Sequence, residues 1–262
     1  MRLSIHKQAD PEDKQKETVI LLHGLLGRAR NLGMLQRALS PFFNTIAFDL
    51  RSHGDSPHGL LDYHVMAKDV LETMDQLNIS KASLIGHSMG GKVAMAVALT
   101  APEHVNKLCV ADISPAQALH GSKEIIQTIS SLLLPSLKTR TEIRQFLVSV
   151  LGKEDMADLV GQNINPGDPA YWTIGLKEIT QSLNIIENWP DSFFAHQWNG
   201  PTLFLRGELS PYIQPKHHPL IHKLFPKADI VTLPGTNHWL HVEKPDEFNS
   251  LVLDFLKNHS ES

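Results

Sequence analysis

Cysteine, net charge and long apolar runs are all scarce in this sequence, and each shortage excludes a class of protein. The 262 residues include one cysteine, Cys109, so no disulfide can form within the chain. The formal net charge is only −4, which gives no general positive field to attract nucleic acid or an anionic membrane. No apolar run approaches the length of a membrane span. We therefore expect neither nucleic acid nor a membrane as a partner.

The composition that remains is typical of a globular protein. Hydrophobic residues make up 42% of the chain and charged residues 20%, which suits a sizeable core in one large α/β domain or a domain with an insertion. Residues 1–7 lack the apolar region of a secretory signal peptide. Cys109 lies in an apolar run and is expected to be an inert core residue. The expectation is a cytoplasmic enzyme, either a monomer or a homodimer.

Apolar runs of strand length alternate with segments of helical spacing along most of the chain. This alternation predicts an α/β fold with a mostly parallel central sheet flanked by helices. The expected strands are 2–7, 18–22, 44–50, a run that begins at Ala82, 105–111, 202–206 and 229–233. The expected helices are 31–39, 63–77, a segment that ends near Thr100, 215–225 and 245–258.

The alternation breaks between residues 116 and 199, where no segment has a good strand pattern. Amphipathic helical pieces at 125–134, 142–151 and 171–183 occur there, with a loop-like stretch at 161–169. We interpret this region as a helical cap, inserted after the strand that ends at Asp112 and lying over the sheet. The predicted division is a core of residues 1–115 and 200–262 and a cap of residues 116–199.

A glycine–serine motif lies where one expected strand passes into a small-residue helix. The sequence Gly86-His87-Ser88-Met89-Gly90 has the Gly-x-Ser-x-Gly form of a nucleophile elbow. Such a turn forces the serine to positive φ and leaves no room for side chains at the two glycines. An ordinary glycine-rich turn is the alternative, because the motif alone is weak. Its place between a strand and a helix predicts Ser88 as a nucleophile, exposed at a helix N-terminus.

A serine hydroxyl is a poor nucleophile unless a base takes its proton and a third group orients that base. The order Ser88, Asp112, His238 is the order expected of a strand–turn–helix serine arrangement, and each residue follows an expected strand. His241 is the competing base. A turn cap before Ser114 is the alternative role for Asp112. We predict that Ser88, His238 and Asp112 form a catalytic triad.

The tetrahedral intermediate of such a reaction needs two backbone donors, which form an oxyanion hole. One donor is predicted to be the N–H of Met89, the residue after the nucleophile. The other is predicted to be the N–H of Leu25, in the loop after the first central strand. His23 in the same loop is expected to stabilise the loop rather than to take part in catalysis.

Together these motifs resemble the α/β-hydrolase superfamily over nearly the whole chain. The resemblance is carried by the elbow, by the loop around His238, by His23-Gly24 and by the segment 49–56. The variants at 23–33, 111–115 and 206–212 resemble a narrower group, the small bacterial esterases and acyl-CoA thioesterases of the YbfF type.

The resemblance carries expectations about the acid and the substrate. Many members of the superfamily place the acid after the strand that follows the insertion, where this sequence has Ser210. The narrower group is similar in placing it early, which matches Asp112, and Glu208 stays the alternative. The resemblance implies hydrolysis of carboxylic esters with short acyl chains and of acyl-CoA thioesters.

Other functions on the same fold remain open. A lyase, a C–C bond hydrolase and a cofactor-free haloperoxidase can use the same three residues, and fold does not choose among them. Dehalogenase and epoxide-hydrolase chemistry is disfavoured because both need a carboxylate where Ser88 stands. A non-catalytic ligand-binding protein is a further alternative. No cofactor or metal is expected, because no carboxylate or cysteine completes a ligand set with His217, His218 and His222.

The expected cap is rich in apolar and aromatic side chains, most explained by core packing and some expected to line an acyl pocket. They are Leu132, Leu133, Leu134, Phe146, Leu147, Tyr171, Trp172, Phe193, Phe194 and Trp198. A basic patch of Lys138, Arg140 and Arg144 lies in the first half of the cap. We hypothesise that this patch contacts the phosphates of coenzyme A, the alternative being a solvated helix face.

Overall fold

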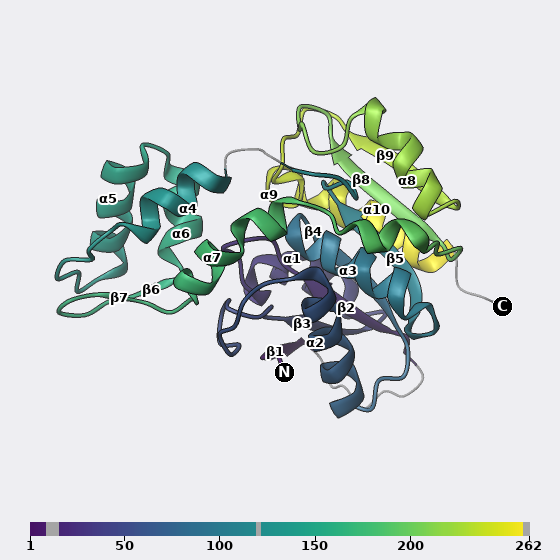
Figure 1. Cartoon of the computed structure of the whole chain (residues 1–262), viewed down its shortest axis with the longest axis horizontal. Coiled ribbons are helices and arrows are strands. Elements are labelled where there is room, and N and C mark those ends of the chain that lie inside the picture. Colours follow the sequence, from purple (N-terminus) through teal and green to yellow (C-terminus); the bar gives the residue numbers. More distant parts are fainter. Residues whose placement is uncertain (9–15, 119–121, 259–262) are drawn as a thin grey trace.

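The computed structural model describes residues 1–8, 16–118 and 122–258. Seven strands of the described residues form one sheet in the order β1-β3-β2-β4-β5-β8-β9 (Figure 1). Strand β1 pairs antiparallel with β3 at the edge, and every other neighbouring pair is parallel. The strands are β1 (Ile5–Gln8), β2 (Thr18–Leu22), β3 (Asn44–Phe48), β4 (Ala82–His87), β5 (Val105–Ala111), β8 (Thr202–Gly207) and β9 (Ala228–Leu233). The predicted fold class is therefore confirmed.

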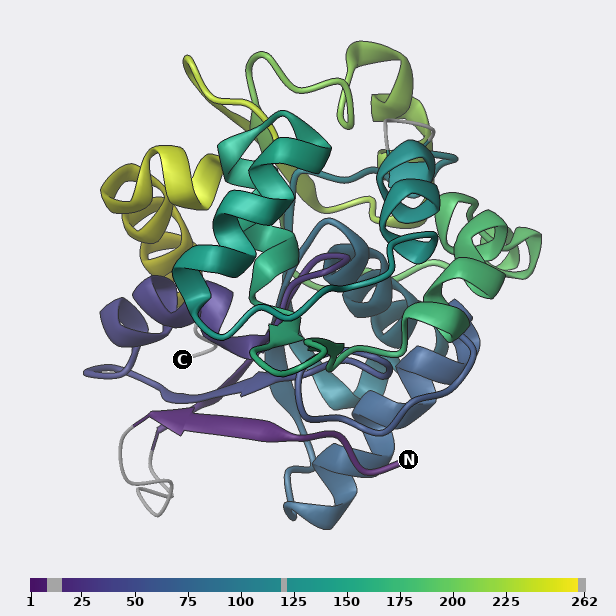
Figure 2. The same cartoon turned by 90° about the vertical axis from the view of Figure 1, so that its left-hand side faces the viewer.

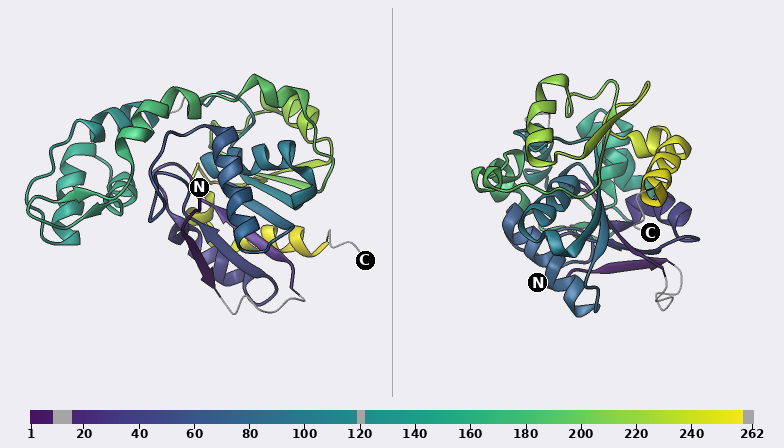
Figure 3. Two further views of the ribbon diagram at one scale, coloured as in Figure 1. Left: turned by 60° about the horizontal axis from the view of Figure 1, so that its bottom comes forward. Right: turned by 90° about the vertical axis from the view of Figure 1, so that its right-hand side faces the viewer.

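Helices cover both faces of the sheet, because the central strands are apolar on both sides. Helices α1 and α10 share a buried apolar cluster with Leu21 and Cys109, whereas α2 and α3 pack in the cluster that holds Ile20 and Leu84. Figure 3 (right) shows the first pair on one side of the sheet and the second pair on the other. Burial raises the pKa of the Cys109 thiol to about 12, which agrees with an inert core residue. The helices are α1 (Gly33–Leu39), α2 (Tyr63–Gln76), α3 (Met89–Thr100), α8 (His218–Leu224), α9 (Leu240–Glu243) and α10 (Pro245–Asn258), with 3₁₀ turns η1 (Ala29–Leu32), η2 (Pro102–His104) and η4 (Pro215–His217).

The region between β5 and β8 is mostly helical. Its elements up to the start of α7 gather beyond one side of the sheet, whereas its last one, η3, packs beside α3 (Figure 1; Figure 2 views the first group face on). They are α4 (Ser122–Ser130), α5 (Arg140–Leu151), α6 (Glu154–Gly161), β6 (Ile164–Asn165), β7 (Tyr171–Trp172), α7 (Leu176–Glu187) and η3 (Asp191–Ala195). We call residues 116–199 the cap, and its status as a separate domain stays a prediction. Among the helices of the described ranges, none is both long and apolar enough to cross a membrane.

One expectation about the cap is wrong in detail. The segment that begins at Tyr171 was expected to be helical, but Tyr171 and Trp172 form a short strand that pairs with Ile164 and Asn165. Aromatic residues favour strands, and a two-residue strand is too short to show a period of its own. The helix α7 starts only at Leu176, after Gly175. Helix α6 is a further helical piece of this region, beyond those named from the sequence.

Candidate active site

The turn between β4 and α3 has the backbone of a nucleophile elbow. Ser88 has φ +53° and ψ −121°, a conformation that L-residues rarely adopt, and it caps α3. A Cβ on Gly86 would lie 2.2 Å from the carbonyl oxygen of Gly90, and one on Gly90 would lie 2.3 Å from that of Leu22. Both contacts are with backbone, so no side-chain movement could relieve them. The turn therefore explains why glycines stand at both positions.

The structure brings Ser88, His238 and Asp112 into one hydrogen-bonded row. Ser88 Oγ lies 2.9 Å from Nε2 of His238, and Nδ1 of His238 lies 2.8 Å from Oδ2 of Asp112. A carboxylate only accepts hydrogen bonds, so Nδ1 carries the proton and Nε2 is left to accept from the serine hydroxyl. The side chain of Asp112 is fully buried, whereas that of His238 is 19% exposed. A hydroxyl, an imidazole and a buried carboxylate that are hydrogen-bonded in this order can support nucleophilic catalysis.

Besides His238, two further groups hold the Asp112 carboxylate, and the sequence did not reveal either of them. Its Oδ1 accepts a hydrogen bond of 2.9 Å from the Gly207 N–H, and its Oδ2 accepts a second from the Ser210 hydroxyl. Ser210 occupies the loop position where an aspartate was considered, and here it supports the carboxylate instead. Glu208, the alternative acid, is exposed and accepts from the Gly235 N–H at 2.7 Å. The geometry favours Asp112 over Glu208.

Two aromatic rings that sequence reasoning missed fix the plane of the His238 imidazole. Tyr212 stacks on it with ring centroids 4.1 Å apart and an angle of 30°. His87, the second residue of the motif, lies 4.8 Å from it and donates from Nε2 to the His238 carbonyl at 2.9 Å. Burial holds the pKa of His87 well below its usual range, so this ring beside His238 is neutral. The competing base, His241, is buried, and its ring lies 4.4 Å from that of His87 rather than beside Ser88.

The loop that carries Leu25 is tied down by two buried histidines. His23 donates from Nδ1 to the Gly24 carbonyl at 2.8 Å and accepts the Leu50 N–H on Nε2 at 2.9 Å. His53 donates to the Arg51 carbonyl at 2.9 Å, and its Nε2 accepts the Leu26 N–H at 3.1 Å. Leu25 and Ser88 line the same cavity. Within residues 16–118, neither the Leu25 nor the Met89 N–H donates a hydrogen bond, so both are free for a substrate oxygen.

Three buried histidines, His23, His53 and His241, should make the stability of the protein sensitive to mild acid. Burial lowers the pKa of His23 to about 4, of His53 to about 3 and of His241 to about 4. The unfolded chain, with ordinary values near 6.5, therefore takes up protons first as the pH falls. The contribution of the neutral, buried rings to the free energy of unfolding is fully present above about pH 6.5 and is lost as the pH falls toward about 4. We expect the free energy of unfolding to fall by about 2 kcal/mol per histidine between pH 7 and pH 5.

Urea unfolding at the two pH values measures this loss. The matched control is His222→Gln, because His222 is exposed and its removal should leave the pH dependence unchanged. A free energy of unfolding that stays flat between pH 7 and pH 5 would contradict the neutral state of the buried rings.

A cavity of about 320 Å³ opens at Ser88 and His238. The cap contributes Ile125, Lys153, Met156 and Leu159 to its lining, and the core contributes Gly24, Leu25, Leu26, His87, Pro211, Tyr212 and Trp239. None of the ten apolar cap residues named from the sequence lines it. Leu147, Phe193 and Trp198 are buried in packing, and Leu133 is 92% exposed. Composition could not distinguish the few residues of α4 and α6 that line the cavity at Ser88.

The three residues of the predicted basic patch do not act as one group. Arg144 forms ion pairs with Glu154 and Asp158, both at 2.7 Å. Arg140 donates to the carbonyls of Gly161 and Ile164 at the end of α6 and in β6. Lys138 is exposed and does not line the cavity at Ser88. It is also absent from the lining of a second cavity, to which Arg140 and Arg144 both contribute. Contact with coenzyme A phosphates stays a prediction.

In the described ranges, one cluster of metal-ligand type occurs, His6, Asp49 and Asp55. Both Asp49 oxygens already accept backbone N–H groups, from Ala29 at 2.7 Å and from Asp55 at 3.0 Å. These bonds hold the loops beside β3, so the cluster is explained by loop structure.

A serine at a strand–helix turn, at the carboxyl edge of a mostly parallel sheet and below an inserted cap, defines the α/β-hydrolase fold. A model of the alpha/beta hydrolase family matches residues 19–251. Esterase YbfF of Escherichia coli (strain K12) is 32% identical over 260 residues, covering 98% of this chain and 100% of the relative. The sn-1-specific diacylglycerol lipase ABHD11 of Mus musculus is 35% identical over 254 residues, covering 93% and 82%. The solved structure of a marine microorganism esterase is 34% identical with a TM-score of 0.89, covering 97% of this chain and 99% of that one.

The chain belongs to the alpha/beta hydrolase family, and its relatives include proteins named as esterases and lipases. It is a hydrolase of this fold, as the resemblance implied.

Proposed function

We propose that the protein is a serine hydrolase that cleaves carboxylic esters of short acyl chains, and also acyl-CoA thioesters, through an acyl-enzyme. The observation that carries the proposal is the row of contacts at 2.9 Å and 2.8 Å from Ser88 Oγ through His238 to Asp112. The names of the relatives that are more than 30% identical support an ester substrate.

In the proposed reaction, His238 Nε2 takes the proton of Ser88 as Oγ attacks the acyl carbon. The carbonyl oxygen becomes an oxyanion, which the N–H groups of Leu25 and Met89 stabilise. The C–O or C–S bond then breaks, His238 returns the proton to the leaving alkoxide or thiolate, and Ser88 keeps the acyl group. Water attacks this ester with His238 again as base, which releases the acid and restores the hydroxyl. Asp112 stabilises the imidazolium in both halves.

The cavity at Ser88 supports a short acyl chain. Its volume of about 320 Å³ is at the lower end for small-molecule sites, and it must hold part of the leaving group as well. Ile125, Met156 and Leu159 give it an apolar wall from the cap. The proposal places the acyl chain against this wall.

A panel of p-nitrophenyl esters and acyl-CoA thioesters of increasing chain length tests the proposal. We expect kcat/KM to be highest for acyl chains of about four carbons and to fall for longer ones, because extra methylenes would exceed the cavity. Turnover of C–C substrates such as meta-cleavage products, with none of the esters, would instead favour a C–C hydrolase. Cytoplasmic location and oligomeric state stay predictions.

A further inference from the structure

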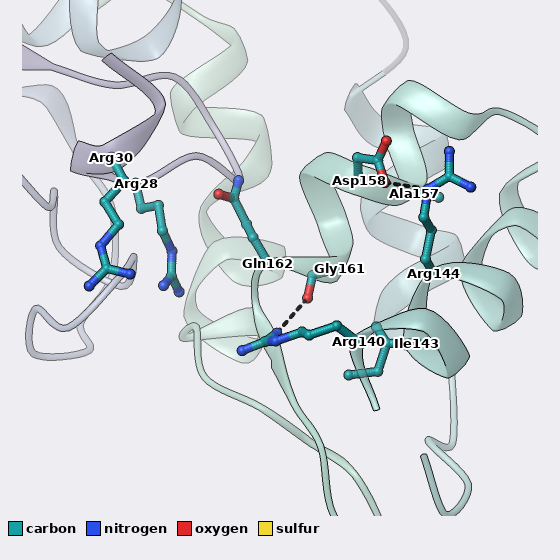
Figure 4. A pocket seen from close by; sticks show the side chains of 9 residues that line it. All are labelled: Arg28, Arg30, Arg140, Ile143, Arg144, Ala157, Asp158, Gly161 and Gln162. Carbon is teal, nitrogen blue, oxygen red and sulfur yellow. Dashed lines mark hydrogen bonds and ion pairs between the residues drawn. The ribbon is translucent and has the colours of Figure 1, made fainter. Parts of the chain in front are cut away.

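A second cavity, of about 430 Å³, lies at the junction of the core and the cap (Figure 4). The core contributes Arg28 and Arg30, at the start of η1, and the cap contributes residues of α5 and α6 and Gln162. It shares no lining residue with the cavity at Ser88. Helix α6 separates the two, because Met156 and Leu159 face the nucleophile whereas its opposite face lines this second cavity.

The lining of this second cavity is strongly basic. It contains four arginines and a single acid, Asp158, which is already paired with Arg144 at 2.7 Å. Figure 4 shows Arg144 turned toward Asp158, with Arg28, Arg30 and Arg140 directed to the remaining open space. Within the part of the chain that the structure describes, Arg28 and Arg30 have no ion pair, and the buried Nε of Arg28 has no hydrogen-bond partner.

The guanidinium of Arg140 is held in place rather than free to swing out. Its Nη1 donates to the carbonyls of Ile164 at 2.5 Å and of Gly161 at 3.3 Å. Carbonyls do not neutralise the charge, and the one acid of the lining, Asp158, is paired with Arg144. Among the described residues, the other three arginines of this cavity therefore have no carboxylate partner. Arg30 and Arg140 are exposed, so water screens part of the repulsion, but the three unpaired guanidinium groups still make the cavity attractive to an anion.

We propose that this cavity, formed by Arg28, Arg30 and Arg140, binds the phosphoryl group of a small phosphorylated compound. A phosphoryl group carries up to two negative charges and several acceptor oxygens, which match several guanidinium forks. A single carboxylate could satisfy only part of this donor set. The ligand joins core to cap, because two of its arginines come from η1 and the third from α5.

A bound ligand would stabilise the hydrogen bonds that the end of α6 makes to the loop beside Ser88. Gln162 and Asn163, which follow this helix, donate to the Leu26 carbonyl at 3.2 Å and 2.7 Å. Leu26 follows Leu25 in the loop beside Ser88. A phosphoryl group that draws η1 and α5 together would therefore hold the cap against this loop.

Calorimetric titration with inorganic pyrophosphate tests the site directly, and it is performed on Ser88→Ala as well as on the wild type. We expect saturable binding by both proteins, so the result does not depend on hydrolysis. The double variant Arg28→Gln/Arg30→Gln should bind about 10-fold more weakly or worse, because charge-assisted hydrogen bonds are lost. The matched control Lys216→Gln/Lys227→Gln removes the same charge at exposed positions outside this cavity and should bind normally.

A second double variant, Arg28→Lys/Arg30→Lys, keeps the net charge and tests the site if the glutamine variant fails to fold. It should also bind more weakly, since lysine lacks the planar fork. Absence of saturable binding by the wild type, or equal binding by the arginine variants and the control, would overturn the proposal.

Two sources of the phosphoryl group are distinguished by competition with p-nitrophenyl butyrate. A separate phosphorylated compound predicts that pyrophosphate binds without raising KM for this ester. A phosphate carried by the substrate itself predicts that coenzyme A raises KM, and that Arg28→Gln/Arg30→Gln removes this effect. The second source rests on the proposed thioester activity, whereas the first does not.

Discussion

Replacement of Ser88 by alanine is expected to lower kcat for p-nitrophenyl butyrate by about 10³-fold or more. In the proposed reaction this hydroxyl forms the acyl-enzyme, and it lies 2.9 Å from Nε2 of His238. Without it, the free N–H groups of Leu25 and Met89 could still polarise a carbonyl, but no covalent intermediate could form. A small residual rate from that polarisation is expected.

The fold should tolerate this change, because alanine removes one oxygen and leaves the backbone hydrogen bond from the Ser88 N–H to the Ala111 carbonyl. Thermal unfolding of Ser88→Ala should therefore resemble that of the wild type. Ser250→Ala, at an exposed position of α10, is the matched control and should keep full activity. Hydrolysis by Ser88→Ala at the wild-type rate would contradict the proposal that Ser88 is the nucleophile.

The sequence was informative wherever a feature depends on neighbouring residues. The strand at 18–22 is apolar throughout, and the structure has β2 over the same residues. The Gly-x-Ser-x-Gly motif predicted a turn with positive φ, and Ser88 has φ +53°. In both cases the structure is set by burial or steric contact within a short segment, so the residues of that segment alone can predict it.

Features that depend on distant segments were missed for the opposite reason. Ser210 donates to Asp112 across 98 positions of sequence, and the stacking of Tyr212 on His238 joins two separate loops. The arginine cavity likewise combines Arg28 with Arg140, which the sequence grouped instead with Lys138 and Arg144. No local periodicity signals such a meeting. The first two are set by how distant loops of the core pack together, and the third by how the cap packs on the core.

The choice of acid can be decided by one pair of variants. Asp112→Asn should lower kcat by about 10³- to 10⁴-fold, because an amide can donate to Nδ1 and so favour the wrong tautomer of His238. The amide also removes the negative charge that stabilises the imidazolium. The side chain keeps almost the same volume, so the Gly207 N–H can still donate its hydrogen bond to the remaining oxygen of residue 112.

Glu208→Gln is the matched control, since it makes the same chemical change at the exposed alternative acid. We expect it to keep kcat within a few-fold of the wild type, because Glu208 contacts the Gly235 N–H rather than His238. Steady-state kinetics with p-nitrophenyl butyrate compares the two variants. If Glu208→Gln were the inactive variant and Asp112→Asn the active one, the acid would have to reach His238 from the loop after β8. The short contact between Asp112 and the His238 ring would then be structural rather than catalytic.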